Sequence, residues 1–140
     1  MKILIAVKQN SDFDTFFIKE NIELANNLGE VVWLDVLTAT EQDLLKKISD
    51  CDVYVSCWGA PKITPKVLEH AKKLKLITHL GSTVAPIVCP EVYQRGIKVI
   101  SGFDYYSEST AEGAISYMLA ALRNIPFFTD RLKKQKIWTQ

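Results

Sequence analysis

The chain has 140 residues, of which 48% are hydrophobic and 24% charged, as in an ordinary folded domain. Its formal net charge of +1 produces no long-range field, so we expect neither nucleic acid nor an anionic membrane surface as a partner. No apolar run approaches the roughly 18 residues that a membrane span needs, and Met1–Val7 is interpreted as a first strand and not as a signal peptide.

The first half of the chain alternates between apolar runs and helical patterns. Lys2–Val7 and Val31–Val36 are continuous apolar runs that predict two strands. Between them, Asp14–Leu28 has apolar residues at helical spacing, and Gly29 follows as the expected C-cap. Thr40–Ile48 predicts a second helix with threonine as its N-cap.

The second half continues the alternation. Asp52–Cys57, Leu74–His79 and Ile97–Ile100 predict three more strands. Thr64–Lys73 begins with a threonine N-cap before a proline, which predicts a helix. Pro90–Arg95 predicts a short helix that ends at a glycine.

The C-terminal part predicts one long helix over Ser109–Asn124, with hydroxyl residues available for capping at its start. Within it, Ala111–Arg123 is apolar on nearly every face, and such a helix is normally buried on all sides. One small sheet cannot cover it, so we expect another domain or a second copy of the chain to pack against it. The polar and basic stretch Thr129–Gln140 is interpreted as a solvated helix or arm.

Strands that alternate with helices form βαβ units, which predict a parallel sheet. The fold class is therefore α/β, with a flavodoxin-like five-stranded parallel sheet, helices on both faces and a long C-terminal apolar helix. We divide the chain into a sheet domain, residues 1–104, and a C-terminal helix with its arm, residues 105–140.

Ligands of such sheets bind beyond the carboxyl ends of the strands. That rule selects three loops that contain glycine: Cys57–Ala60, Gly81–Thr83 and Ser101–Phe103. Glycine lets the backbone approach a ligand closely, and exposed peptide N–H groups can hold an anion. Ser82 and Thr83 add hydroxyl donors, so we expect the loop from Gly81 to bind a carboxylate, although a plain turn is an open alternative.

Two larger side chains belong to this candidate site. His79 ends a strand next to the proposed anion-binding loop and could donate to an anion or act as an acid, or be a structural residue. Trp58, followed by Gly59, would face the cleft and favour a compact or apolar substrate side chain, or else be a core residue.

No catalytic set is recognisable in the sequence. It contains no nucleophile–base pair, no metal-ligand spacing, and neither GxGxxG nor GxxxxGK[ST]. Asp12 and Asp14 suggest a phosphate-accepting receiver domain, but the third strand ends in Cys57 where such a domain needs an aspartate.

Cys51, Cys57 and Cys89 are an odd number of cysteines without CxxC spacing. We predict buried free thiols in a reducing compartment, with the cytoplasm as the location.

The order of the motifs resembles the N-terminal part of the NAD-dependent D-isomer-specific 2-hydroxyacid dehydrogenases. The resemblance rests on "PKITPKVLEHAKKLKLITHLGSTVAPI", "RGIKVISG" and "STAEGAISYMLAALRNI". It runs from about Asp50 to Trp138, whereas the first 49 residues fit by pattern only.

The resemblance implies a bilobal enzyme whose substrate lobe precedes a Rossmann domain. In this family the amides of the loop matching Gly81, Ser82 and Thr83 bind the substrate carboxylate. The helix matching residues 109–124 leads into the nucleotide domain and helps form a homodimer. Its matching residues are Thr110, Glu112, Met118, Leu122 and Arg123.

In the family the catalytic residues and the glycine fingerprint for NAD or NADP lie in the Rossmann part. The chain ends at Gln140, about where that fingerprint is approached. The resemblance therefore implies a substrate-binding lobe without its cofactor domain, which alone binds no cofactor or metal and is inactive. Its substrate is a small 2-oxo or 2-hydroxy acid.

The sequence departs from the family at Thr83, where a glycine is usual, at Ala85–Val88, and at Gly113, where a histidine is common. These departures leave the identity of the substrate open. A second hypothesis belongs to another class of protein. The chain would be a free-standing flavodoxin-like interaction module without catalysis, which binds a partner through the apolar face of Ala111–Arg123.

Overall fold

The computed structural model describes residues 1–136 of the chain. It separates into two compact units, Met1–Phe103 and a second unit that begins at Asp104. We describe each unit by itself.

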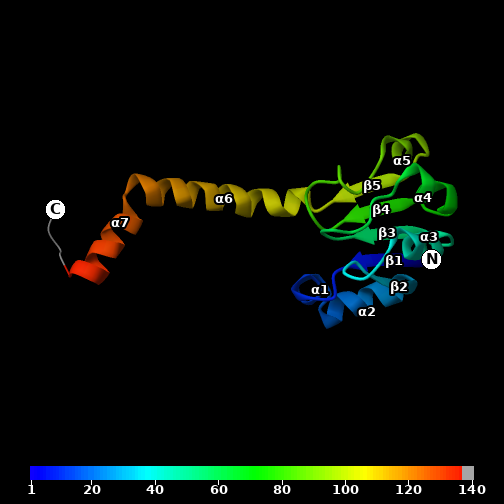
Figure 1. Cartoon of the computed structure of the whole chain (residues 1–140), viewed down its shortest axis with the longest axis horizontal. Coiled ribbons are helices and arrows are strands. Elements are labelled where there is room, and N and C mark those ends of the chain that lie inside the picture. The colour runs from blue at the N-terminus through cyan, green and yellow to red at the C-terminus, as the bar shows by residue number, and fades with distance from the viewer. Residues whose placement is uncertain (137–140) are drawn as a thin grey trace. The chain divides into compact units, whose positions relative to one another are not determined.

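The first unit is built on a single five-stranded sheet (Figure 1). All neighbouring strands are parallel and follow the order β2-β1-β3-β4-β5, which is the flavodoxin-like order. The predicted fold class is thus confirmed. The strands are β1 (Lys2–Val7), β2 (Glu30–Asp35), β3 (Val53–Ser56), β4 (Leu76–His79) and β5 (Lys98–Ser101).

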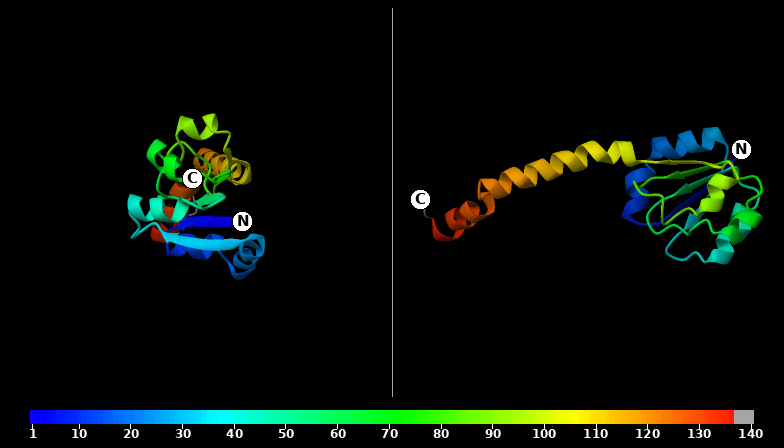
Figure 2. Two further views of the ribbon diagram at one scale, coloured as in Figure 1. Left: turned by 90° about the vertical axis from the view of Figure 1, so that its right-hand side faces the viewer. Right: turned by 90° about the horizontal axis from the view of Figure 1, so that it is seen from above.

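Helices cover both faces of this sheet, as Figure 2 shows. Along β1, alternate side chains enter two different cores: Leu4 packs in one with α3, α4 and α5, and Ile5 in the other with α1 and α2. The helices are α1 (Ser11–Phe16), α2 (Lys19–Leu28), α3 (Glu41–Ile48), α4 (Pro65–His70) and α5 (Pro90–Gln94).

The single helix predicted over Asp14–Leu28 is wrong, because the structure has two helices there. The first begins at Ser11, where the side chain of Asn10 accepts a hydrogen bond from the backbone N–H of Asp12. The chain leaves helical geometry at Phe17, whose buried ring packs edge-on against Trp33 with 5.0 Å between centroids. The aromatic packing overrides the helical periodicity.

The predicted caps of α3 and α4 are confirmed. Thr40 and Asp43 form a reciprocal capping box at the start of α3, and the Thr64 hydroxyl accepts from the amide of Val67 in α4. However, α4 ends at His70, three residues before the predicted end at Lys73, because the backbone turns at Ala71 toward β4.

The glycine after α2 is required by a close approach and not by a left-handed turn. Gly29 has φ 165°, which any residue can adopt. A Cβ at this position would lie 2.0 Å from the carbonyl oxygen of Met1.

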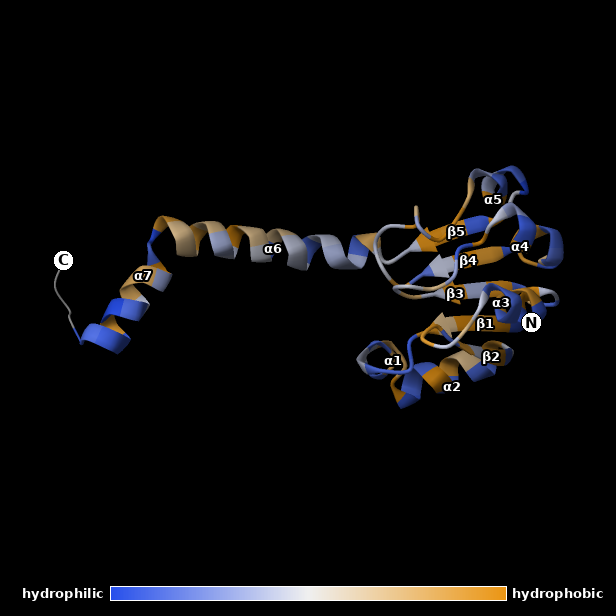
Figure 3. Ribbon diagram, viewed as in Figure 1, coloured by the Kyte–Doolittle hydropathy of each residue, from blue (hydrophilic) through white to orange (hydrophobic). Residues whose placement is uncertain are grey.

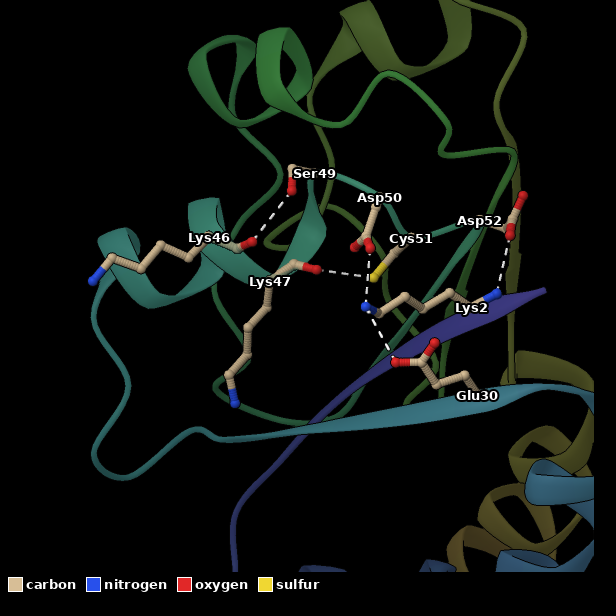
Figure 4. Close-up of polar contacts among 8 residues, drawn as sticks. All are labelled: Lys2, Glu30, Lys46, Lys47, Ser49, Asp50, Cys51 and Asp52. Carbon is tan, nitrogen blue, oxygen red and sulfur yellow. Dashed lines mark hydrogen bonds and ion pairs between the residues drawn. The ribbon is translucent and has the colours of Figure 1, made fainter.

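Charged side chains join three strands at the amino edge of the sheet (Figure 4). The Lys2 Nζ atom lies 2.9 Å from the carboxylate of Asp50 and 3.2 Å from that of Glu30. Asp52 accepts a hydrogen bond from the backbone N–H of Lys2. These contacts hold β1 beside β2 and β3, opposite the edge where ligands of this fold bind.

All three cysteines are free and buried, as predicted. Burial raises the pKa of the Cys51 thiol to about 11, and its Sγ donates to the Lys47 carbonyl (Figure 4). The thiols therefore belong to the core.

The second unit is helical: α6 spans Phe103–Leu122, α7 Ile125–Asp130, and a π-helix Arg131–Gln135. Because α6 begins at Phe103, the prediction that Ser109 and Thr110 cap it is wrong. The Thr110 hydroxyl donates instead to the Tyr106 carbonyl within the helix. The predicted arm is helical and exposed almost throughout to Lys136, whereas Trp138 lies outside the described residues.

None of the helices in residues 1–136 is both long and apolar enough to cross a lipid bilayer. In α6 no residue is buried within the described chain, and Met118 and Leu122 are 59% and 78% exposed. Figure 3 shows hydrophobic residues along much of this helix.

Candidate functional site

A small cavity of about 140 Å³ lies beyond the carboxyl ends of β3 and β4. We call it the Trp58–His79 cavity, and its walls are Trp58, Gly59, Ala60, His79, Ser82, Thr83, Pro86 and Ile87. Five of the six residues predicted for substrate binding thus line one cavity. The sixth, Gly81, lies against two of the walls.

Gly81 is buried where two ring nitrogens approach its backbone. A Cβ at this residue would lie 2.6 Å from Nε2 of His79 and 2.9 Å from Nε1 of Trp58. Both distances are too short for a real side chain, so glycine is needed here for close approach. The same geometry places two potential N–H donors beside one point of the loop.

Trp58 is presented by a tight turn after β3. The amide of Ala60 donates to the carbonyl of Cys57 at 3.1 Å, and Gly59 has φ +77°, in the left-handed region that favours glycine. The indole stacks obliquely on Phe16 of α1, with 5.4 Å between ring centroids. Being 46% exposed, Trp58 is a wall of the cavity and not a core residue.

His79 is the last residue of β4 and is only 3% exposed. Its Nδ1 atom lies 3.0 Å from the hydroxyl of Ser56, which is also placed to donate to the Thr78 carbonyl at 3.2 Å. Burial lowers the pKa of His79 from its ordinary value of 6.5, although the backbone of Ser56 partly opposes this. The imidazole is therefore neutral at pH 7.

The position of the single hydroxyl proton of Ser56 is coupled to the tautomer of His79. When the hydroxyl donates to Thr78, Nδ1–H donates to the hydroxyl and Nε2 is an acceptor. When the hydroxyl donates to Nδ1, Nε2 carries the proton and can donate to an anion. An anion in the cavity favours the second arrangement.

The loop after β4 keeps its donors available. Within residues 1–136, the amides of Gly81, Ser82 and Thr83 donate no hydrogen bond, and the two hydroxyls make none either. The third predicted loop is tied to this one, since the amide of Gly102 contacts the carbonyls of His79 and Gly81 at 3.0 Å each. The carbonyls of His79 and Gly81 are thus engaged, whereas the N–H groups of Gly81, Ser82 and Thr83 are not.

A wider hollow of about 660 Å³ lies beyond β1 and β2, but its charged groups already have partners. Asp35 accepts from the amides of Gln9 and Leu37 and from the hydroxyl of Thr38. Lys47 donates to the Trp33 carbonyl. These side chains stabilise the loops around them. In the part of the chain that the structure describes, no group of three or more His, Cys, Asp or Glu is placed to hold a metal ion.

The predicted residues of the long helix lie elsewhere, in the second unit. Thr110, Glu112, Met118 and Leu122 are on α6, and Arg123 follows it, with its amide donating to the Leu119 carbonyl.

Sequence reasoning missed Ser56, Pro86 and Ile87, whereas Ala60 lies in the predicted loop Cys57–Ala60. A polar residue inside the buried strand "VYVS" was the available signal for Ser56. No signal in the sequence indicates Pro86 or Ile87 as cavity residues.

A doubly wound parallel sheet with a cavity beyond its strand ends is the arrangement of α/β domains in which small ligands are held at that edge. The model of the family "D-isomer specific 2-hydroxyacid dehydrogenase, catalytic domain" matches residues 10–134. The chain therefore belongs to this family, which confirms the resemblance. The match starts well before Asp50, so the family likeness includes much of the part that fitted by pattern only.

Two relatives show the range of the family. The chain is 40% identical over 117 residues to D-3-phosphoglycerate dehydrogenase of Methanocaldococcus jannaschii, covering 83% of this chain and 22% of that one. It is 34% identical over 96 residues to hydroxypyruvate reductase of Thermotoga maritima, covering 69% of this chain and 31% of that one. The chain thus spans less than a third of these proteins.

A solved structure, D-lactate dehydrogenase from Aquifex aeolicus complexed with NAD and lactic acid, has the same fold. The TM-score is 0.68 at 18% identity, and the match covers 99% of this chain and 38% of that one.

Proposed function

We propose that this chain is the substrate-binding lobe of an NAD-dependent D-2-hydroxyacid dehydrogenase, and that the Trp58–His79 cavity holds a small 2-oxo or 2-hydroxy acid. The observation that carries the proposal is the set of N–H groups around this cavity. The amides of Gly81–Thr83 have no partner in residues 1–136, and two ring nitrogens approach the same loop.

A carboxylate in the cavity accepts hydrogen bonds from these groups. Backbone amides are fixed by the strand before them, so they hold the anion without the entropy loss of long side chains. The Trp58 indole N–H and the Nε2–H form of His79 add two neutral donors. Held in this way, the acid presents its C2 atom to a cofactor in one orientation.

In the complete enzyme that we propose, the cofactor and the hydride transfer belong to a Rossmann domain. The relatives are named as a dehydrogenase and a reductase, and the Aquifex aeolicus structure contains NAD. NAD supplies the hydride, with NADP as the alternative, and closure of the two lobes excludes water. Alone, the chain binds no cofactor, has no turnover and functions in the cytoplasm only as part of the complete enzyme.

The second unit serves as the dimer contact. Met118 and Leu122 of α6 are exposed in the described chain, and large exposed apolar surfaces mark interfaces. The same observation favours the second candidate function, an interaction module without catalysis, which predicts a dimer but no binding of 2-oxo acids.

The test is a titration of the ¹⁵N-labelled chain with pyruvate, followed by NMR. We expect saturable shifts at the amides of Gly81, Ser82 and Thr83 and at the Trp58 indole, and none with the uncharged methyl ester of pyruvate. Shifts confined to the hollow at Gln9 and Asp35, or no shifts, would overturn the proposal and favour the interaction module.

Turnover separates the chain from the complete enzyme. With NADH and pyruvate, the purified chain should oxidise no NADH above the rate without protein. Substantial turnover would contradict the assignment of the chemistry to another domain.

A further inference from the structure

The size of the Trp58–His79 cavity limits its ligand. Its volume of about 140 Å³ is well below the roughly 300–1,000 Å³ of pockets that hold drug-sized ligands. The side chains of Trp58, Ala60, Pro86 and Ile87 give it an apolar wall. There is room for a carboxylate, an oxo group and a short apolar substituent.

No lysine or arginine lines this cavity among residues 1–136. Two lysines lie near its walls. Lys8 approaches Gly59, where its Nζ lies 3.8 Å from a Cβ placed on the glycine, but it is ion-paired with Asp12 at 3.9 Å. Lys62 lines a separate hollow, which shares only Ser82 and Thr83 with the cavity.

The donors of the cavity are all neutral. The indole and the amides carry no charge, and burial lowers the pKa of His79, so its imidazole is neutral at pH 7. Neutral N–H groups can compensate one carboxylate. A second anionic group would be desolvated against the apolar wall without a cation to pair with.

We propose that the acid bound here carries one negative charge only: a 2-oxo or 2-hydroxy monocarboxylate with a short side chain and no phosphate. This inference rests on the proposed function and narrows its substrate class. Under this inference the substrate of the chain differs from that of its 40% identical relative, which is named for a phosphorylated acid.

The test compares pyruvate with 3-phosphonooxypyruvate in titrations of the full 140-residue chain, followed by the NMR signals of Ser82 and of the Trp58 indole. We expect pyruvate to bind at least ten-fold more tightly than the phosphorylated acid. If the phosphorylated acid binds equally well or better, the inference is wrong and the proposed function stands. If neither acid binds, the proposed function fails and the inference fails with it.

A second test adds a positive charge to the wall of the cavity at Pro86, which is exposed. Pro86→Arg adds a cation to the wall, and Pro86→Met is the control of similar length without charge. Relative to Pro86→Met, Pro86→Arg should tighten binding of 3-phosphonooxypyruvate at least ten-fold and change pyruvate binding far less. Equal binding of the phosphorylated acid by the two variants would overturn the charge argument.

Lys8 and Lys62 are tested directly. The variants Lys8→Ala and Lys62→Ala should leave the affinity ratio of the two acids unchanged. A loss of phosphorylated-acid binding in either variant would show that a lysine reaches the cavity, which contradicts the inference.

Discussion

The buried hydroxyl of Ser56 lies 3.0 Å from Nδ1 of His79, and the two residues are register partners on β3 and β4. The hydroxyl holds the ring in place, and its proton position is coupled to the tautomer of the ring. Both residues are buried, yet the other ring nitrogen, Nε2, lies beside the loop that begins at Gly81. A strand residue thereby acts on the candidate site through its neighbour.

Ser56→Ala should lower the free energy of unfolding by about 1–2 kcal/mol, because a buried imidazole nitrogen loses its partner. It should also weaken pyruvate binding several-fold, since nothing then donates to Nδ1 to keep the proton on Nε2. Urea unfolding and the NMR titration measure the two effects. Ser49→Ala, which removes an exposed hydroxyl bonded to the Lys46 carbonyl, is the control and should change neither. Unchanged binding in Ser56→Ala would show that the tautomer is irrelevant.

Gly81→Ala should destabilise the domain by about 1–3 kcal/mol, the usual effect of overpacking, because its Cβ would lie 2.6 Å from Nε2 of His79. Thermal unfolding measures this change, and the Trp58 indole signal reports the displaced ring. Gly113→Ala is the matched control, since nothing lies within 4 Å of a Cβ at that position of α6. The control should be neutral or stabilising by up to about 1 kcal/mol. Equal stability of the two variants would contradict the close approach.

The sequence alone predicted much of the fold because the local signals agreed with the tertiary structure. The continuous apolar runs became strands, and Thr40 and Thr64 became caps because their hydroxyls accept from nearby amides. The helix break at Phe17 was missed because its cause is non-local: the ring packs against Trp33, far along the chain.

The candidate site was predictable in part. The rule that ligands bind at strand ends selected the loops with Trp58, His79 and Gly81, and these come together at one cavity. Ser56, Pro86 and Ile87 were missed because they reach the cavity or His79 only through strand register and loop packing. The cavity volume has no counterpart in the sequence.

The pH dependence of the free energy of unfolding should reveal the titration of His79. Its pKa is lowered by burial in the folded chain and is ordinary in the unfolded chain, so the unfolded chain binds more protons just below pH 6.5. Stability contributed by the neutral ring is fully present above pH 6.5 and is lost as the pH falls toward the lowered pKa. Urea unfolding between pH 7.5 and 5 should show this loss, and His79→Gln should show less of it. His70→Gln is the control for removing an exposed histidine. An identical pH dependence in His79→Gln and the parent chain would contradict the prediction.

The carboxylates at the amino edge of the sheet titrate at lower pH than His79. Their effect on stability therefore falls in a separate pH range. The side-chain contact with Lys2 holds the pKa of Asp50 below its ordinary value of 3.8, and the Lys2 amide and Lys75 do the same for Asp52. Stability from these groups is present above about pH 4 and is lost only as the pH falls below it. The interval between pH 7.5 and 5 therefore isolates the histidine.

The exposed apolar residues of α6 should hold two copies of the chain together. Met118→Asp with Leu122→Asp places two charges on a surface that we propose is buried between copies, where an unpaired charge is strongly unfavourable. Sedimentation of the parent chain should give a dimer at micromolar concentration, and the double variant should sediment as a monomer with its sheet domain folded. Leu24→Asp changes an equally exposed leucine on α2 and should remain dimeric. A parent chain that stays monomeric at high concentration would contradict the proposed dimer contact.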